Sequence, residues 1–303
     1  MKTRILLFVL MLTGVVSYAQ QDAQFTQYMY NTINVNPGYA GSRGVMSIFG
    51  LHRTQWVGLD GAPTTNAFSL NTPINNSNVG IGVSFINDKI GPTNENNISV
   101  DVSYTVPMNE EYKLSFGLKA SGNLFNLNSA DLNPQDPGDD HLQDVSNKFT
   151  PGIGAGVYLH GGNFYAGVSV PNFIRTENYN DNDYSVRQRE INYYFITGYV
   201  FDITPDLKFK PALLSKVVAG APLQVDVSGN FLLYEKLTLG VAYRWSAAVS
   251  AMAGFQITDG LFIGYGYDHE TTNLRRYNSG SHEIFLRFEL FRNHDRITTP
   301  RFF

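Results

Sequence analysis

The stretch Val79-Gly80-Ile81-Gly82-Val83-Ser84-Phe85 places an apolar side chain at every second position, with glycine or serine between them. The same period of two recurs in residues 98–106 and 152–159. Successive side chains of a β-strand point to opposite faces, so each segment predicts a strand with one apolar face and one small or polar face. This period alone leaves open whether the apolar face lines the core of a soluble sandwich or the outside of a membrane barrel.

Similar runs, separated by turn residues, predict about fourteen strands. They span residues 44–55, 64–72, 78–87, 96–107, 112–125, 151–159, 163–171, 190–203, 207–216, 223–234, 236–246, 249–258, 261–270 and 281–291. Tight turns (108–111, 161–162, 204–206, 235, 259–260) alternate with longer loops (56–63, 88–95, 126–150, 172–190, 271–280). An even strand number with one short rim and one long rim is typical of an outer-membrane barrel. The sequence therefore predicts an all-β, transmembrane antiparallel barrel with short periplasmic turns and long extracellular loops.

Two features fit this scheme poorly. The connection at Ala247-Ala248 is short where the outer rim should be long, and Pro211 cannot donate a ladder hydrogen bond.

The N-terminus predicts export. Lys2 and Arg4 precede an apolar run over residues 5–16, and small residues at Ser17 and Ala19 predict a signal peptide over residues 1–19, cleaved near Ala19. Without it, 20 basic residues face 26 acidic ones, and this charge of −6 argues against a nucleic-acid partner. The chain has no cysteine, and its charged content of 16% is low for a soluble domain, which suits a wall that faces lipid.

We expect one barrel domain with short extensions. Residues 20–43 form an N-terminal segment that either plugs the lumen or lies in the periplasm, residues 44–291 form the barrel, and residues 292–303 form a periplasmic tail. On the last strand, parity directs Ile284, Leu286, Phe288 and Leu290 to lipid and Phe285, Arg287, Glu289 and Phe291 to the lumen. Lumen charges of mixed sign are expected to pair and brace the interior; they are Asp101, Lys119, Asp226, Arg244, Asp268, Arg287 and Glu289.

Three motifs resemble those of a known family. The first contains Gln24, Phe25 and Tyr28, followed by Asn36, Pro37, Tyr39 and Gly41; the second contains Arg53, Gln55 and Trp56; and the third is the ending Pro300-Arg301-Phe302-Phe303. Together they resemble the PorP/SprF family of type IX secretion and gliding proteins over the full mature length. Gly38 stands where alanine is common in that family, and Thr32 where proline is expected.

The resemblance implies an integral outer-membrane barrel that anchors or displays a secreted cargo at the cell surface. The implied partner is the C-terminal domain of a type IX cargo such as a surface adhesin, with a periplasmic peptidoglycan-binding lipoprotein as a second candidate. We expect no enzymatic activity and no cofactor. Acidic and aromatic residues of the two longest loops are the candidates for partner binding; they are Asp131, Asp136, Asp140, His141, Tyr179, Asp181, Asp183 and Tyr184.

Other functions stay open at this point. The same barrel could be a diffusion porin or solute channel. A rim hydrolase would use Asp268, His269 and Glu270, but neighbouring strand residues point to opposite faces, which is a poor start for a catalytic triad. Oxygen ligands over residues 178–183 could hold calcium, although the familiar glycine and distal glutamate of a calcium loop are missing, and Asp139-Asp140-His141 is a weaker metal candidate.

Overall fold

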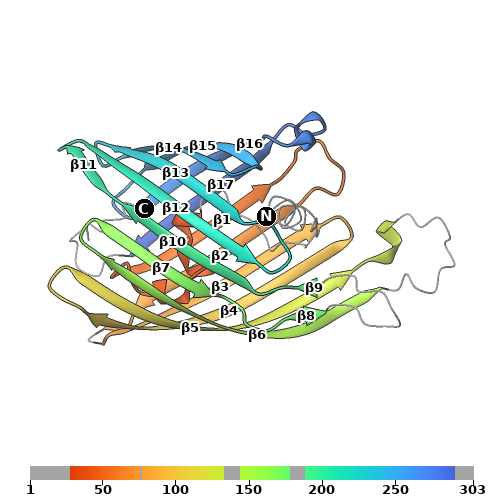
Figure 1. Ribbon diagram of the computed structural model, residues 1–303, viewed down its shortest axis with the longest axis horizontal. Helices are drawn as coiled ribbons and strands as arrows, with labels where there is room; N and C mark the ends of the chain where they lie inside the picture. Colours follow the sequence, from red (N-terminus) through yellow and green to blue (C-terminus); the bar gives the residue numbers. More distant parts are fainter. Residues whose placement is uncertain (1–27, 76, 133–143, 178–187, 291–303) are drawn as a thin grey trace, which may run out of the picture.

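The computed structural model describes residues 28–75, 77–132, 144–177 and 188–290. These residues form a closed antiparallel barrel of fourteen strands, as Figure 1 shows, which confirms the predicted fold class. The strands are β1 (Met46–Thr54), β2 (Thr64–Pro73), β3 (Val79–Ile90), β4 (Thr93–Pro107), β5 (Tyr112–Leu127), β6 (Val145–Gly161), β7 (Phe164–Val170), β10 (Asn192–Tyr199) continued by β11 (Phe201–Thr204), β12 (Leu207–Val218), β13 (Gln224–Leu233), β14 (Leu237–Arg244), β15 (Ala248–Gln256), β16 (Leu261–Glu270) and β17 (Ser281–Leu290). A separate short pair, β8 (Thr176–Glu177) and β9 (Gln188–Arg189), lies in the loop after β7.

Each strand pairs with its sequence neighbours, and the first strand pairs with the last. Met46 of β1 faces Leu290 of β17, and the register continues to Thr54 opposite His282. Closure leaves no open sheet edge along this seam, as a bilayer requires, because hydrocarbon offers no partner to a backbone amide.

The parity of β17 is as predicted. Ile284 and Leu286 are 55% and 45% exposed, whereas Phe285 and Arg287 are 1% and 4% exposed and face the lumen. The barrel is thus apolar on its outer face, whereas polar residues share the lumen with a smaller set of buried apolar ones, an arrangement unlike that of a soluble sandwich. Among the described residues, no helix is long and apolar enough to cross a bilayer.

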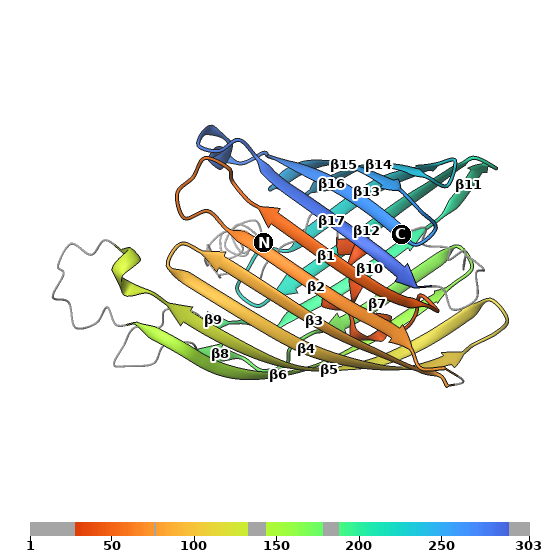
Figure 2. The same cartoon turned by 180° about the vertical axis from the view of Figure 1, so that it is seen from behind.

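The wall is much taller on one side than the predicted loops suggest. Strands β3 and β4 continue to a turn at Gly91-Pro92, where a loop over residues 88–95 was predicted. Strands β5 and β6 leave a connection over residues 128–144 instead of 126–150. The outer parts of these strands are polar on their outward face, where the Asn87 amide donates to Asn94 (2.7 Å) and Asn96 (2.9 Å). They lack the apolar alternation that marks a lipid-facing strand, and Figure 2 shows them extending past their neighbours.

Proline interrupts one predicted strand. The segment predicted over residues 190–203 is two strands, β10 and β11, separated at Val200. Register places Gly198 opposite Ala212 and Phe201 opposite Phe209, so the break lies beside Pro211, which has no N–H to donate. The short outer connection is also real: β14 and β15 are joined by Trp245, Ser246 and Ala247, with Ser246 at a positive φ of 55°.

Candidate functional site

The N-terminal segment lies inside the barrel. Residues 28–45, which we call the plug, form three short 3₁₀ turns: η1 (Tyr28–Tyr30), η2 (Thr32–Asn34) and η3 (Pro37–Tyr39). In Figure 1 the plug is the red segment enclosed by the strands. Tyr30, Ile33 and Tyr39 are almost fully buried, so the plug forms the core of the lumen.

The motif Asn36–Gly41 rests directly on strand backbone. Lumen-facing glycines on the wall leave the space: a Cβ on Gly80, Gly117 or Gly156 would come closer than 3.0 Å to plug atoms. The partners of Gly80 and Gly117 are backbone atoms of Ala40, Pro37 and Gly38, which cannot rotate away. Glycine at these wall positions is therefore required by the approach of the plug.

Asn36 is the central polar residue of this contact. Its Oδ1 accepts the N–H of Gly38 (2.9 Å), which caps η3, and its Nδ2 donates to the carbonyl of Val157 on β6 (3.0 Å). Asn36 is fully buried, so both interactions compensate for its lost hydration. Gly38 is tightly surrounded, with Ser115 O and Tyr158 Cβ at 3.0 and 3.1 Å from an added Cβ.

Wall side chains fasten the plug from several strands. Ser69 donates to Asn31 Oδ1 (2.9 Å), Ser103 to Ala40 O (2.7 Å) and Ser169 to Val35 O (2.7 Å). These serines lie on β2, β4 and β7, so the plug is held around a wide arc of the wall. Aromatic packing completes the attachment, with the Tyr30 ring 4.5 Å from that of Phe285 on β17 and 5.5 Å from that of Phe262 on β16.

Buried ion pairs brace the lumen, as the mixed charges predict. They join Lys119 to Asp101 (3.2 Å), Arg244 to Asp226 (2.6 Å), and Arg43 of the plug to Glu289. Lys119 also donates to Ile33 O (3.2 Å), so one ammonium ties β4, β5 and the plug together. Buried charges are stable only when paired, and here two pairs cross-link neighbouring strands while the third joins the plug to β17.

The Arg53, Gln55 and Trp56 motif lies at the outer end of the β1–β17 seam. Arg53 is 2% exposed and binds Asp268 of β16 (2.7 Å) and Glu283 of β17 (3.2 Å). Trp56 Nε1 donates to Glu270 (2.8 Å), and the N–H of Gln55 donates to Pro63 O (2.9 Å). The motif thus locks the first strand and its loop onto the last two strands.

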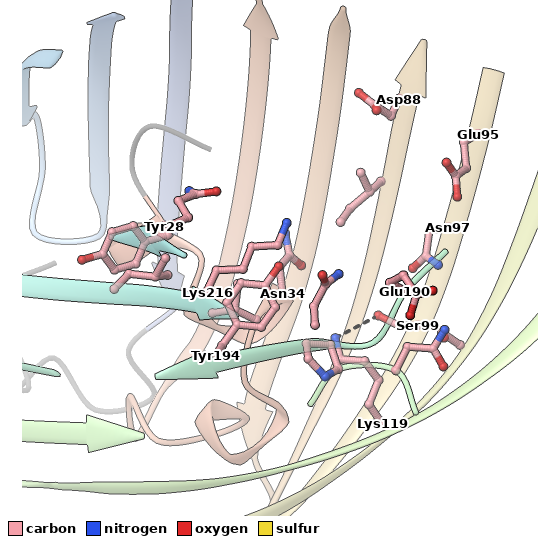
Figure 3. Close-up of a pocket in the computed structure, with 18 of the residues that line it drawn as sticks. Tyr28, Asn34, Asp88, Glu95, Asn97, Ser99, Lys119, Glu190, Tyr194 and Lys216 are labelled. Carbon is pink, nitrogen blue, oxygen red and sulfur yellow. Dashed lines mark hydrogen bonds between the residues drawn. The ribbon is translucent and has the colours of Figure 1, made fainter. Parts of the chain in front are cut away.

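A cavity of about 130 Å³, lined mainly by polar and charged residues, lies on the extracellular side of the plug. Figure 3 shows Asn34 and Tyr28 of the plug on one side of it and Asp88, Glu95 and Lys119 of the tall wall on another. Its carboxamides can each donate and accept a hydrogen bond; they are Asn34, Asn97, Asn172, Asn192 and Gln224. Both amide atoms of Asn34 are buried without a hydrogen-bond partner among the described residues.

The segment after β7 folds inward to form part of this cavity. An added Cβ on Gly154 would collide with the backbone of Pro171, and one on Gly152 would lie 3.0 Å from Asn172 Oδ1, so this segment lies on β6 as the plug does at Gly156. Alternate glycines in residues 152–156 thus seat two different segments on one strand.

The sequence model of the protein family described as type IX secretion system membrane protein PorP/SprF matches residues 17–288 of this chain. The chain belongs to the PorP/SprF family. No curated protein sequence matches it significantly. Similar solved structures include the Acinetobacter baumannii outer membrane protein Omp33 (10% identity, 81% of this chain, 98% of that chain, TM-score 0.49) and the CymD monoaromatic hydrocarbon channel (10%, 89%, 94%, 0.49). The Ralstonia pickettii toluene transporter TbuX is a third (8%, 91%, 99%, 0.46).

Two of the three PorP/SprF motifs lie in the described part of this barrel, at two separate places; the third, at residues 300–303, lies outside it. Tyr28, Asn36, Pro37, Tyr39 and Gly41 form the plug, and Arg53, Gln55 and Trp56 lie at the outer seam. Gln24 and Phe25 lie outside the described residues. These motifs were identified from the sequence, but the wall glycines on which the plug rests were not. The signal that could have identified them is the recurrence of glycine at every second position of the lumen-facing side of a strand.

The loop candidates are mostly beyond the described chain. Asp131 lies in η4 (Ser129–Leu132). Ser129, in the same turn, donates its hydroxyl and its N–H to Asp144 (2.6 and 2.7 Å), and these hydrogen bonds lower the pKa of Asp144. The remaining partner candidates, Asp136, Asp140, His141, Tyr179, Asp181, Asp183 and Tyr184, and both metal candidates at residues 178–183 and 139–141, lie outside the described residues.

The residues considered for a rim hydrolase are engaged separately. Asp268 is buried against Arg53, Glu270 binds Trp56, and His269 is exposed on the opposite face from Asp268. Within the described ranges, no three His, Asp or Glu side chains gather closely enough to hold a metal ion.

Proposed function

We propose that this chain is a non-enzymatic scaffold of the outer membrane that binds the C-terminal domain of a secreted type IX cargo, such as a surface adhesin, and holds it at the cell surface. Membership of the PorP/SprF family supports the secretion role. The observation that carries the proposal is the plug, which occupies the lumen and is hydrogen-bonded to β2, β4, β6 and β7. A filled and braced lumen suits a rigid platform better than a path for solutes.

The tall wall supplies a surface for such a cargo. Strands β5 and β6 have 16 and 17 residues, against 8 and 9 for β14 and β15, so at about 3.3 Å per residue they are some 25 Å longer. The cavity opens beside this wall, where carboxamides and charges suit a wet protein interface. We propose the loops after β5 and β7 as the contact, and a periplasmic peptidoglycan-binding lipoprotein as a second partner on the opposite rim.

A pull-down with the purified cargo domain tests the outer contact. One variant replaces residues 133–143 with a short Gly-Ser turn, and a second replaces residues 178–187 with Asn-Gly, which joins β8 to β9 as a tight hairpin. The control shortens residues 58–61 of the β1–β2 loop. We expect loss of cargo in the first two variants only; equal capture by all proteins would reject the loop assignment.

Planar-bilayer recording separates the scaffold from the diffusion porin. We expect the purified protein without cargo to pass no steady current, because the plug is fastened to the wall by hydrogen bonds and ion pairs. A steady open conductance from the intact protein would favour the channel.

A further inference from the structure

An outward-facing group of rings lies at the extracellular ends of β16 and β17. The Tyr265 hydroxyl is 2.6 Å from His282 Nδ1, and the ring of His282 lies 5.2 Å from that of Tyr267. On the same lipid-facing side, Ile284 lies opposite Tyr265 and is 55% exposed, and Ile263, further from the rim, is 41% exposed. The rings therefore occupy the level at which aromatic side chains of membrane proteins meet lipid headgroups.

The loop above these rings is positively charged. Residues 271–280 contain Arg275 and Arg276 and no acidic residue. Both arginines are exposed on η5 (Asn273–Arg276), and neither forms an ion pair with any described residue. The nearby carboxylate of Glu270 is engaged by Trp56 and Thr272. Asp60 belongs to a different loop, the one between β1 and β2, and forms no ion pair with either arginine among the described residues.

Hydrogen bonds hold this loop in one shape. Thr272 Oγ1 accepts the Leu274 N–H (3.3 Å) at the start of η5, and Asn278 Nδ2 donates to Leu274 O (2.7 Å). The Tyr267 hydroxyl donates to Ser279 O (3.1 Å), and Val57 N donates to Gly280 O (2.9 Å). The two guanidinium groups are thus presented from a fixed loop, seen as the blue turn beyond β16 in Figures 1 and 2. Preorganised donors lose less entropy when they bind.

We propose that Arg275, Arg276, Tyr265, Tyr267 and His282 form a binding site for the phosphorylated headgroup of an outer-leaflet glycolipid. Guanidinium groups bind phosphate through paired, charge-assisted hydrogen bonds. The rings below offer their faces and His282 Nε2 to the sugar, and the exposed isoleucines contact the acyl chains. The site lies away from the cavity and the tall-wall loops, so it stands apart from the proposed cargo contact.

Native mass spectrometry of the full-length protein, titrated in detergent with bisphosphorylated lipid A, tests this site. We expect R275Q/R276Q to bind roughly 25-fold more weakly, since each surface cation near a membrane contributes a several-fold attraction. The control K89Q/K113Q removes the same charge from two exposed positions elsewhere on the barrel and should leave lipid A binding unchanged. Y267F, which releases the loop from β16, should weaken binding with both arginines present.

The lipid itself is tested in two further arms. Lipid A without its phosphates should bind the native protein as weakly as the intact lipid binds R275Q/R276Q. Millimolar inorganic phosphate should displace little lipid A, because it lacks the sugar and acyl contacts. Equal binding by R275Q/R276Q and the native protein, indifference to the lipid phosphates, or full displacement by inorganic phosphate would each overturn the proposal.

Discussion

Substituting alanine for Gly117 tests whether the plug truly rests on the wall. A Cβ at this position would come closer than 3.0 Å to backbone atoms of Pro37 and Gly38, so the plug must lift from β5. Three hydrogen bonds flank this point and would stretch together: Asn36 to Val157 (3.0 Å), Ser169 to Val35 (2.7 Å) and Ser103 to Ala40 (2.7 Å). At about 1 kcal/mol each, their loss lowers the free energy of unfolding by about 3 kcal/mol.

Urea unfolding in detergent, followed by the gel mobility of unheated samples, measures this loss. The matched control is Gly50→Ala on β1, where an added Cβ would make ordinary contacts of 3.7 and 3.8 Å with Leu286. We expect G50A to unfold like the native protein or slightly later, because alanine restricts the unfolded chain. G117A should also show intermittent current in planar bilayers. If G117A is as stable and as silent as G50A, the plug is not seated on strand backbone as described.

Three further outcomes follow from the wall and its outer end. Arg53→Met should lower the free energy of unfolding by about 3–5 kcal/mol, because Asp268 and Glu283 stay buried without this cation. The control Arg175→Gln, at an exposed pair, should change it by under about 1 kcal/mol. Similar losses for both variants in urea titrations would contradict this prediction. Leu286→Arg near the middle of β17 should cost about 2–4 kcal/mol and Leu290→Arg at its periplasmic end about 1 kcal/mol or less, so equal costs would place the bilayer wrongly. Ser129→Ala should raise the pKa of Asp144 towards that of an ordinary aspartate in a carboxyl NMR titration. The Ser129–Asp144 contact contributes its full stabilisation above the ordinary aspartate pKa and loses it as the pH falls through the lowered pKa of Asp144. An unchanged pKa in Ser129→Ala would exclude the contribution of this hydroxyl.

The sequence predicted the barrel because lipid imposes a regular pattern. Wherever a strand faces hydrocarbon, as at Ile284 and Leu286, apolar residues recur at every second position, and strand number and parity follow. Above the membrane this constraint ends. Asn87, Asn94 and Asn96 continue their strands through hydrogen bonds between side chains, and nothing in their polarity distinguishes them from a loop.

The interior was less predictable because its determinants are spread along the chain. Gly80, Gly117 and Gly156 look like ordinary members of a small, polar face, and their purpose depends on a segment 40 to 120 residues earlier. Likewise Pro211 could be recognised as a poor ladder residue, but only the register shows that it lies opposite Tyr199, next to the break between β10 and β11. The motifs of the plug indicated importance without indicating position.

The attachment of the plug to β17 has a consequence for the order in which the barrel folds. Arg43 and Tyr30 come before the first strand in the chain, yet they clasp Glu289 and Phe285 on the last one. The strand that closes the barrel, β17, therefore also holds the plug in place. When β17 pairs with β1 last, the contacts that fix the plug form in the same step as the closure of the wall. A closed barrel with an open lumen, which would make the membrane permeable, is then not formed.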